Sequence, residues 1–322
     1  MHAQVDIAVQ ATARSGQAPT WDVGTETLLW TDPRAGEVHR YRPGHANATM
    51  TLQQQTGGAK PRSRGGLVLH LQEGIALFDA HGEQRTWLVY WAREGVQAGA
   101  TMIDRKGRLW ATTMREDESG DGWLARVNPD GSAGVIIKDL RAGLGLATSP
   151  DDTRFYIADA GTSRIEVLDF DINAGLMGNR RTLCEVGGQP SGLAVATDGS
   201  LWTAVRDKGE LHRYAPSGEL AETIPLPAQR PTNLCFGGQD LQDLYITTAH
   251  EDLPSPTTTD GAVLTLRTTT EGLRAFAFTG WHVFGLVLLV GIFGVGLMFT
   301  GLSQGAIAAS FAVAGTSYKA SA

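Results

Sequence analysis

The chain has 322 residues and a formal net charge of −7, and 42% of its residues are hydrophobic. This composition is typical of globular proteins, and an acidic chain without a block of basic residues is poorly suited to bind nucleic acid. The two cysteines, Cys184 and Cys235, match neither a zinc-site spacing nor a disulfide framework. We therefore expect free thiols and no nucleic-acid partner.

The N-terminal segment has no apolar core of the kind that secretory signals carry. We expect residues 1–14 to form a short extension that precedes the first structural unit.

A repeat of strand-forming segments follows and fills most of the chain. Six segments follow turns and centre on large apolar anchors spaced about 40 to 46 residues apart: Trp30, Leu69, Trp110, Tyr156, Trp202 and Tyr245. A second set of six alternating strands, each leading to a turn, interleaves with the first. This is the period of a four-stranded propeller blade. We predict an all-β, six-bladed propeller over residues 15–268; a pair of β-sandwiches is the alternative, which the single period disfavours.

The C-terminal part of the chain is apolar. Trp281–Leu302, "WHVFGLVLLVGIFGVGLMFTGL", contains no Asp, Glu, Lys or Arg and is long enough to cross a bilayer as a helix. We predict a linker at 269–280, a transmembrane helix at 281–302 and a short tail at 303–322. The segment also weakly resembles the first helix of sodium/solute symporters, which leaves a truncated or fused gene product as an alternative.

The placement of the propeller follows from three observations. There is no N-terminal signal, the cysteines show no disulfide pattern, and Arg267 and Arg274 precede the apolar segment while only Lys319 follows it. We expect a single-pass membrane protein with a cytoplasmic propeller.

Five separated motifs occur in the order typical of one family. They are "PTWDVGTETLLWTD" (19–32), "DRKGRLWATTM" (104–114), "LGLATSPDDTRFYIADAGTSRIEVLDFD" (144–171), "PSGLAVATDGSLWTAV" (190–205) and "RPTNLCFGGQDLQDLYITTA" (230–249). The chain resembles the SMP-30/gluconolactonase/regucalcin family over residues 15–268, with the apolar tail outside. The resemblance implies a six-bladed propeller that hydrolyses sugar lactones with one divalent metal.

The resemblance also assigns the functional positions. The family's four metal ligands, a Glu, two Asn and an Asp, fall on Gln17, Gly99, Leu144 and Ser191. The Asp, here Ser191, is also the family's proposed base, and the substrate-side Arg and Asp fall on Gln97 and Ala100. A hard cation is held by charged oxygen ligands, and both carboxylates are replaced. We expect no cofactor, or at most weakly bound Ca²⁺, Zn²⁺ or Mn²⁺.

The functional expectation combines the resemblance with these substitutions. The resemblance implies a lactone hydrolase with a small sugar or lactone ligand, whereas the altered positions argue against normal turnover. We expect weakened or lost activity; the alternative is a non-catalytic, membrane-tethered propeller with a ligand-binding or sensory role. A serine triad of Ser191 with His39, His70 or His212 is a further alternative. His39 and His212 occupy the same place in sister repeats, "VHRY" and "LHRY", which favours a packing or surface role.

Overall fold

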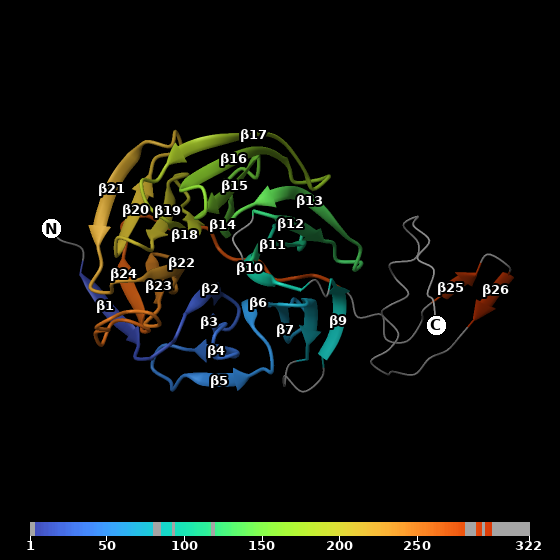
Figure 1. The fold of residues 1–322 in the computed structure, drawn as a ribbon, viewed down its shortest axis with the longest axis horizontal. Helices are drawn as coiled ribbons and strands as arrows, with labels where there is room; N and C mark the ends of the chain where they lie inside the picture. The colour runs from blue at the N-terminus through green and yellow to red at the C-terminus, as the bar shows by residue number, and fades with distance from the viewer. Residues whose placement is uncertain are drawn as a thin grey trace. The chain divides into compact units, whose positions relative to one another are not determined.

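The structure is a computed structural model that describes residues 4–79, 85–91, 94–116 and 120–280, with two short strands at 288–291 and 294–297. Through residue 280 the described chain forms six four-stranded antiparallel sheets and no helix. The six innermost strands contact one another in a closed ring, and the sheets radiate from it as blades (Figure 1). The all-β, six-bladed propeller is confirmed.

The first three blades follow one another along the chain, and each is given from its innermost strand outward. They are β2 (Gln17–Asp22), β3 (Thr27–Asp32), β4 (Glu37–Tyr41) and β5 (Ala48–Thr51); β6 (Thr56–Pro61), β7 (Leu67–Leu71), β8 (Gly74–Phe78) and β9 (Arg85–Tyr90); and β10 (Val96–Ile103), β11 (Leu109–Arg115), β12 (Gly122–Val127) and β13 (Ala133–Leu140).

The next two blades repeat this order. They are β14 (Gly143–Thr148), β15 (Arg154–Asp159), β16 (Arg164–Asp171) and β17 (Leu176–Glu185); and β18 (Pro190–Val195), β19 (Leu201–Val205), β20 (Glu210–Tyr214) and β21 (Leu220–Pro225).

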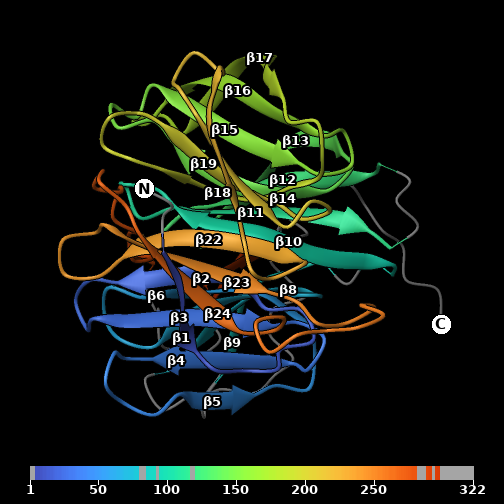
Figure 2. The same cartoon turned by 90° about the vertical axis from the view of Figure 1, so that its left-hand side faces the viewer.

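The sixth blade joins the two ends of the propeller chain. It contains β22 (Pro231–Gly237), β23 (Asp243–Thr248) and β24 (Val263–Arg267), and its outermost strand is β1 (Val5–Val9). β1 runs antiparallel to β24, with Val5 opposite Leu266 (Figure 2). The blades therefore begin within the segment that we expected to be an extension.

The repeat anchors form the packing between neighbouring blades. All six anchors are at most 5% exposed. Trp110 packs on Phe155 of the next blade with ring centroids 5.2 Å apart, and Trp202 meets Phe236 across blades five and six at 6.2 Å. Burial of such large side chains contributes about 1.5–3 kcal/mol each. This inter-blade contact is why one unit cannot fold alone.

Of the packing or surface role that we expected for the two sister histidines, the structure shows packing. His39 is 7% exposed and stacks on Trp30 with centroids 3.7 Å apart, while His212 is 4% exposed and its Nδ1 lies 3.0 Å from the Tyr214 hydroxyl.

Residues 271–280, which we call the strap, cross from blades five and six to blades two and three (Figure 1). Leu273 N donates to Val195 O at 2.9 Å, and Phe278 N donates to Pro61 O at 2.9 Å. The Phe278 side chain is 0% exposed and belongs to the cluster between blades two and three. We expected a linker here, and the segment instead packs against the ends of the inner strands.

Residues 281–322 form a second unit of the chain. Of the predicted membrane span, 281–302, the structure describes only β25 (Leu288–Gly291) and β26 (Gly294–Leu297), which pair antiparallel. The rest of the span lies outside the described residues. The described residues contain no helix that is long and apolar enough to cross a bilayer. The transmembrane helix and the cytoplasmic placement stay predictions.

Candidate functional site

A polar cavity of about 380 Å³ opens where the inner strands begin. Its lining includes Gln17 at the start of β2, residues 97–100 of β10, Leu144 near the start of β14, and Gln189 just before β18. We call it the polar cavity. Its size is within the range of pockets that hold small organic ligands.

A β-bulge in every inner strand shapes the polar cavity. The register shifts near the start of each of them, for example between Gln17 and Thr20 in β2 and between Ala98 and Thr101 in β10; the other four strands do the same. A bulge leaves a residue outside the ladder and re-aims its neighbours. Which residue faces the cavity is therefore set by the bulges.

The structure brings most of the predicted site residues together. Gln17, Gly99 and Leu144, three of the four predicted ligand positions, line the polar cavity. The two substrate-side positions, Gln97 and Ala100, line it as well.

Ser191, the predicted base position, is 0% exposed. Its Oγ donates to the backbone oxygen of Thr232 at 2.5 Å, across the boundary between blades five and six. The hydroxyl thus forms a hydrogen bond that links the inner strands β18 and β22.

Gly99 sits in a space that admits no side chain. A Cβ placed there would lie 2.5 Å from Thr112 Oγ1 and 2.9 Å from Gly143 O. The Thr112 hydroxyl donates to Gly143 O at 2.5 Å and accepts from Ala100 N at 2.7 Å. Threonine thus fills the room that a ligand at position 99 would need.

Sequence reasoning missed a set of buried threonines around the inner strands. Thr203 Oγ1 donates to Gly192 O at 2.7 Å, and Thr232 Oγ1 donates to Gly16 O. Thr112 and Thr203 each follow an aromatic anchor by one or two residues, and that spacing was the available signal. Each of these hydroxyls thus satisfies a backbone carbonyl in or just before an inner strand.

The donor set does not fit a divalent metal. The polar cavity is lined by uncharged amides at Gln17, Gln97, Gln189 and Asn233. In the described part of the chain, no three His, Cys, Asp or Glu side chains come together as a metal site would require. Hard cations need several carboxylates for affinity. Three carboxylates do line the cavity, those of Glu116, Glu251 and Asp252, but they form no such group, and Glu251 is paired with Arg14 and Arg34.

The charge of the polar cavity has the opposite sign to that of the chain. Its lining includes six arginines, at positions 14, 34, 115, 141, 206 and 230, and three carboxylates, those of Glu116, Glu251 and Asp252. The formal excess is three positive charges, in a protein of net charge −7. Such a surface attracts anions.

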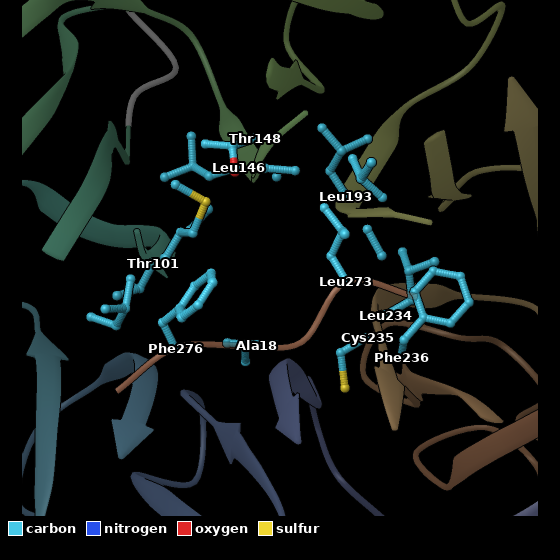
Figure 3. Close-up of a pocket in the computed structure, with 18 of the residues that line it drawn as sticks. Ala18, Thr101, Leu146, Thr148, Leu193, Leu234, Cys235, Phe236, Leu273 and Phe276 are labelled. Atoms are coloured by element: carbon cyan, nitrogen blue, oxygen red, sulfur yellow. The ribbon is translucent and has the colours of Figure 1, made fainter. Parts of the chain in front are cut away.

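A second cavity, of about 270 Å³, lies at the opposite ends of the inner strands, against the strap. Leu146, Leu193, Leu234, Leu273 and Phe276 give it an apolar lining (Figure 3).

Lys60 and Cys235 are two of the titratable residues that line this second cavity. Lys60 Nζ donates to Thr20 Oγ1 at 2.5 Å, and burial lowers the pKa of Lys60 to about 8. Burial raises the pKa of the Cys235 thiol to about 12. Both cysteines are free, as predicted.

No serine triad forms in the described residues. His70 is 0% exposed, its Nδ1 lies 2.9 Å from Thr101 Oγ1, and burial lowers its pKa to about 3. His39 and His212 pair within their own blades. None of these three histidines is hydrogen-bonded to Ser191, so none of them activates its hydroxyl.

Known proteins with similar sequences include a lactonase and several regucalcins. The chain is 33% identical over 278 residues to a 6-deoxy-6-sulfogluconolactonase of Pseudomonas putida, covering 82% of this chain and 95% of that protein. It is 29% identical over 267 residues to regucalcin of Danio rerio, covering 77% and 87%.

A solved regucalcin from Agrobacterium tumefaciens shares the fold, with a TM-score of 0.82, 20% identity, and coverage of 86% of this chain and 98% of that one. Residues 15–250 match the family described as the SMP-30/Gluconolactonase/LRE-like region. The chain therefore belongs to the SMP-30/gluconolactonase family.

Proposed function

We propose that this protein binds a small sugar or sugar lactone in the polar cavity and that its lactone hydrolysis is weakened or lost. The observation that carries the proposal is the state of Ser191, which is fully buried and hydrogen-bonded to a backbone carbonyl at the position of the family's base. A general base must reach the water that it deprotonates. A buried hydroxyl that donates to a carbonyl does not.

The ligand class follows from the lining. Amides at Gln17, Gln97, Gln189 and Asn233 offer both donors and acceptors, which suit sugar hydroxyls. The relative from Pseudomonas putida acts, by its name, on the lactone of a sulfonated sugar acid. That relationship supports a sugar-derived ligand here.

The test is an assay of lactone hydrolysis by the full chain in detergent. δ-Gluconolactone is the probe, and acid release is followed with EDTA and with added Ca²⁺, Mn²⁺ or Zn²⁺. We expect a rate equal to spontaneous hydrolysis in every condition. A rate that rises with metal and falls to background with EDTA would overturn the loss of activity.

Binding is measured separately. Calorimetric titration with D-glucose, which cannot hydrolyse, should show an interaction that Gln97→Ala weakens. Gln239→Ala is the matched control, because this glutamine lies in the turn between β22 and β23 and does not line the cavity. Equal binding by both variants would place the sugar elsewhere.

The second candidate function is a non-catalytic, membrane-tethered propeller with a sensory role. The uncharged family ligand positions and the apolar segment 281–302 both favour it. We propose a single-pass anchor with a cytoplasmic propeller. Alkaline carbonate washing of membranes should leave the full chain in the pellet, and release into the supernatant would rule out the anchor. Protease protection in sealed cells tests on which side of the membrane the propeller lies, and a cytoplasmic propeller should be protected.

A further inference from the structure

Arg206 stands out among the charged residues of the polar cavity. It follows β19 directly, and its backbone N donates to Gln189 O at 2.9 Å. Its side chain is half-buried and lines the cavity. Within the described ranges its guanidinium makes no hydrogen bond and no ion pair. A half-buried guanidinium whose five donors have no protein partner is available to an acceptor bound in the cavity.

The neighbours of Arg206 are themselves cationic. Arg230 and Arg34 line the same cavity as Arg206. Burial lowers the pKa of Arg206, and the charges of Arg230 and Arg34 lower it further. The carboxylates of Asp252 and Glu251 act in the opposite direction but less strongly. The site therefore holds three positive charges in close proximity.

The nearby carboxylates do not neutralise this group. The Glu251 carboxylate already pairs with Arg14 and, at 3.4 Å, with Arg34. Arg230 Nη1 donates to the backbone oxygen of Glu251 at 2.5 Å and not to its carboxylate. Asp252 is exposed at the rim. Among the residues that the structure describes, Arg206 and Arg230 thus line the cavity without an ion pair to a carboxylate.

We propose that Arg206, Arg230 and Arg34 form a subsite for a tetrahedral oxyanion, a sulfonate or phosphate, carried by the ligand of the polar cavity. This inference rests on the proposed function for the sugar part of the ligand. The three arginines come from blades one, five and six, so they approach from different directions. A group with three terminal oxygens can accept from all of them, whereas a planar carboxylate presents two.

The remaining lining fits the rest of such a ligand. The amides of Gln97 and Asn233 belong to the same cavity as the three arginines. The structure therefore assigns one ligand with two chemically distinct ends, a polyol ring and an anion. Binding of a neutral sugar uses only the first.

The experiment compares probes that share a ring and differ in charge. Glucose, glucose 6-phosphate and glucose 6-sulfate are titrated into the full chain in detergent, and inorganic phosphate is titrated alone. We expect both charged sugars to bind at least tenfold more tightly than glucose, about 1.4 kcal/mol. Their affinity should fall as salt rises, because the added interaction is ionic.

Arg206→Gln tests the subsite, since it keeps most of the side-chain length and removes the charge. It should abolish the preference, so that the charged sugars bind no more tightly than glucose. Arg164→Gln is the matched control, because Arg164 is an exposed arginine paired with Glu185 and does not line the cavity. The control should retain the full preference.

The outcomes separate this inference from the proposed function. Glucose binding without any preference for the charged sugars overturns the anion subsite and leaves the sugar site standing. Arg206-dependent binding of inorganic phosphate without binding of any glucose ring supports the subsite and overturns the sugar ligand. An unchanged preference in Arg206→Gln overturns the assignment to these arginines.

Discussion

Replacing Ser191 with Asp restores the family's residue at the position of the base and asks whether the site tolerates it. In the structure the Ser191 side chain is 0% exposed, and its hydroxyl donates to Thr232 O at 2.5 Å. A carboxylate has no proton to donate. The substitution therefore removes a hydrogen bond and introduces a charge at the same point.

The cost has two parts. Leaving the buried carbonyl of Thr232 without a donor costs about 1–3 kcal/mol. Full burial raises a carboxyl pKa by about 3 units or more, and each unit corresponds to about 1.4 kcal/mol. At pH 7 the charge therefore adds about 4 kcal/mol. The sum, about 5–7 kcal/mol, approaches the whole stability of an ordinary domain.

The pH dependence identifies the charge. The new carboxyl would have a folded pKa above its unfolded value of about 3.9. Its penalty is absent below pH 4 and grows as the pH rises toward the folded pKa. Ser191→Ala is the control, because it loses the same hydrogen bond without gaining a carboxyl. Urea unfolding, followed by tryptophan fluorescence at low and neutral pH, measures both variants.

We expect the Asp variant to be about 4 kcal/mol less stable than the Ala variant at pH 7 and to match it near pH 4. Added Ca²⁺ should not restore the stability that the Asp variant has lost. Equal stability of the two variants at both pH values would show that the side chain reaches water. That result, or stabilisation of the Asp variant by Ca²⁺, would refute the argument that position 191 is closed to catalysis.

Four further predictions concern the scaffold. Burial lowers the pKa of His70 to about 3, so between pH 6.5 and 5 the imidazole takes up a proton in the unfolded chain but not in the folded one, and the parent loses stability. His70→Gln lacks this group and should lose less stability over that pH range, by up to about 2 kcal/mol in urea unfolding. Equal losses in the two proteins would contradict a buried neutral imidazole. In Gly272→Ala the new Cβ would lie 1.9 Å from Phe236 Cγ, and we expect a loss of about 1–3 kcal/mol; Gly178→Ala, where a Cβ meets nothing within 4 Å, should change stability by less than about 0.5 kcal/mol. Phe278→Ala should cost about 3–5 kcal/mol in urea unfolding if the strap is part of the core, and a cost near zero would mean that the strap does not pack. Deletion of residues 1–10 uncovers the edge of β24 and should produce concentration-dependent association in light scattering; a monomer at all concentrations would argue against β1 as a protecting strand.

The sequence was sufficient to predict the blades, because a large apolar residue recurs once in each blade at a regular spacing. Each anchor, such as Trp110 or Trp202, must be buried between sheets, and its recurrence reports the sheets directly. β1 has no such anchor, since "VDIAV" is a short alternating strand like many others. β1 pairs with β24 because the first and last strands of the propeller complete the same blade. This pairing depends on the assembled propeller and cannot be read from the segment itself.

The site was predictable in part. Motifs on either side of Gln17, Gly99 and Leu144 fix their places, and these residues do meet in the polar cavity. The burial of Ser191 was not predictable, because a bulge between Ser191 and Ala194 shifts the register in which they lie. One residue of shift reverses the face that a side chain occupies.

The arginines of the polar cavity could not be found in the sequence at all. They occur singly and far apart, from Arg14 to Arg230, in a chain whose net charge is negative. Only the fold brings them to one opening. Composition reveals blocks of charge in the sequence, but it does not reveal single charged residues that the fold brings together.

The pairing of β1 with β24 also has a consequence for how the chain folds. Val5 lies opposite Leu266, so this contact joins residues separated by almost the whole propeller. Contacts of such sequence separation are slow to form, because the loop between them must be ordered first. During synthesis, β1 emerges before any blade and has no partner until β24 has left the ribosome. Of the 24 propeller strands that the structure describes, the one that is made first therefore waits longest for its partner.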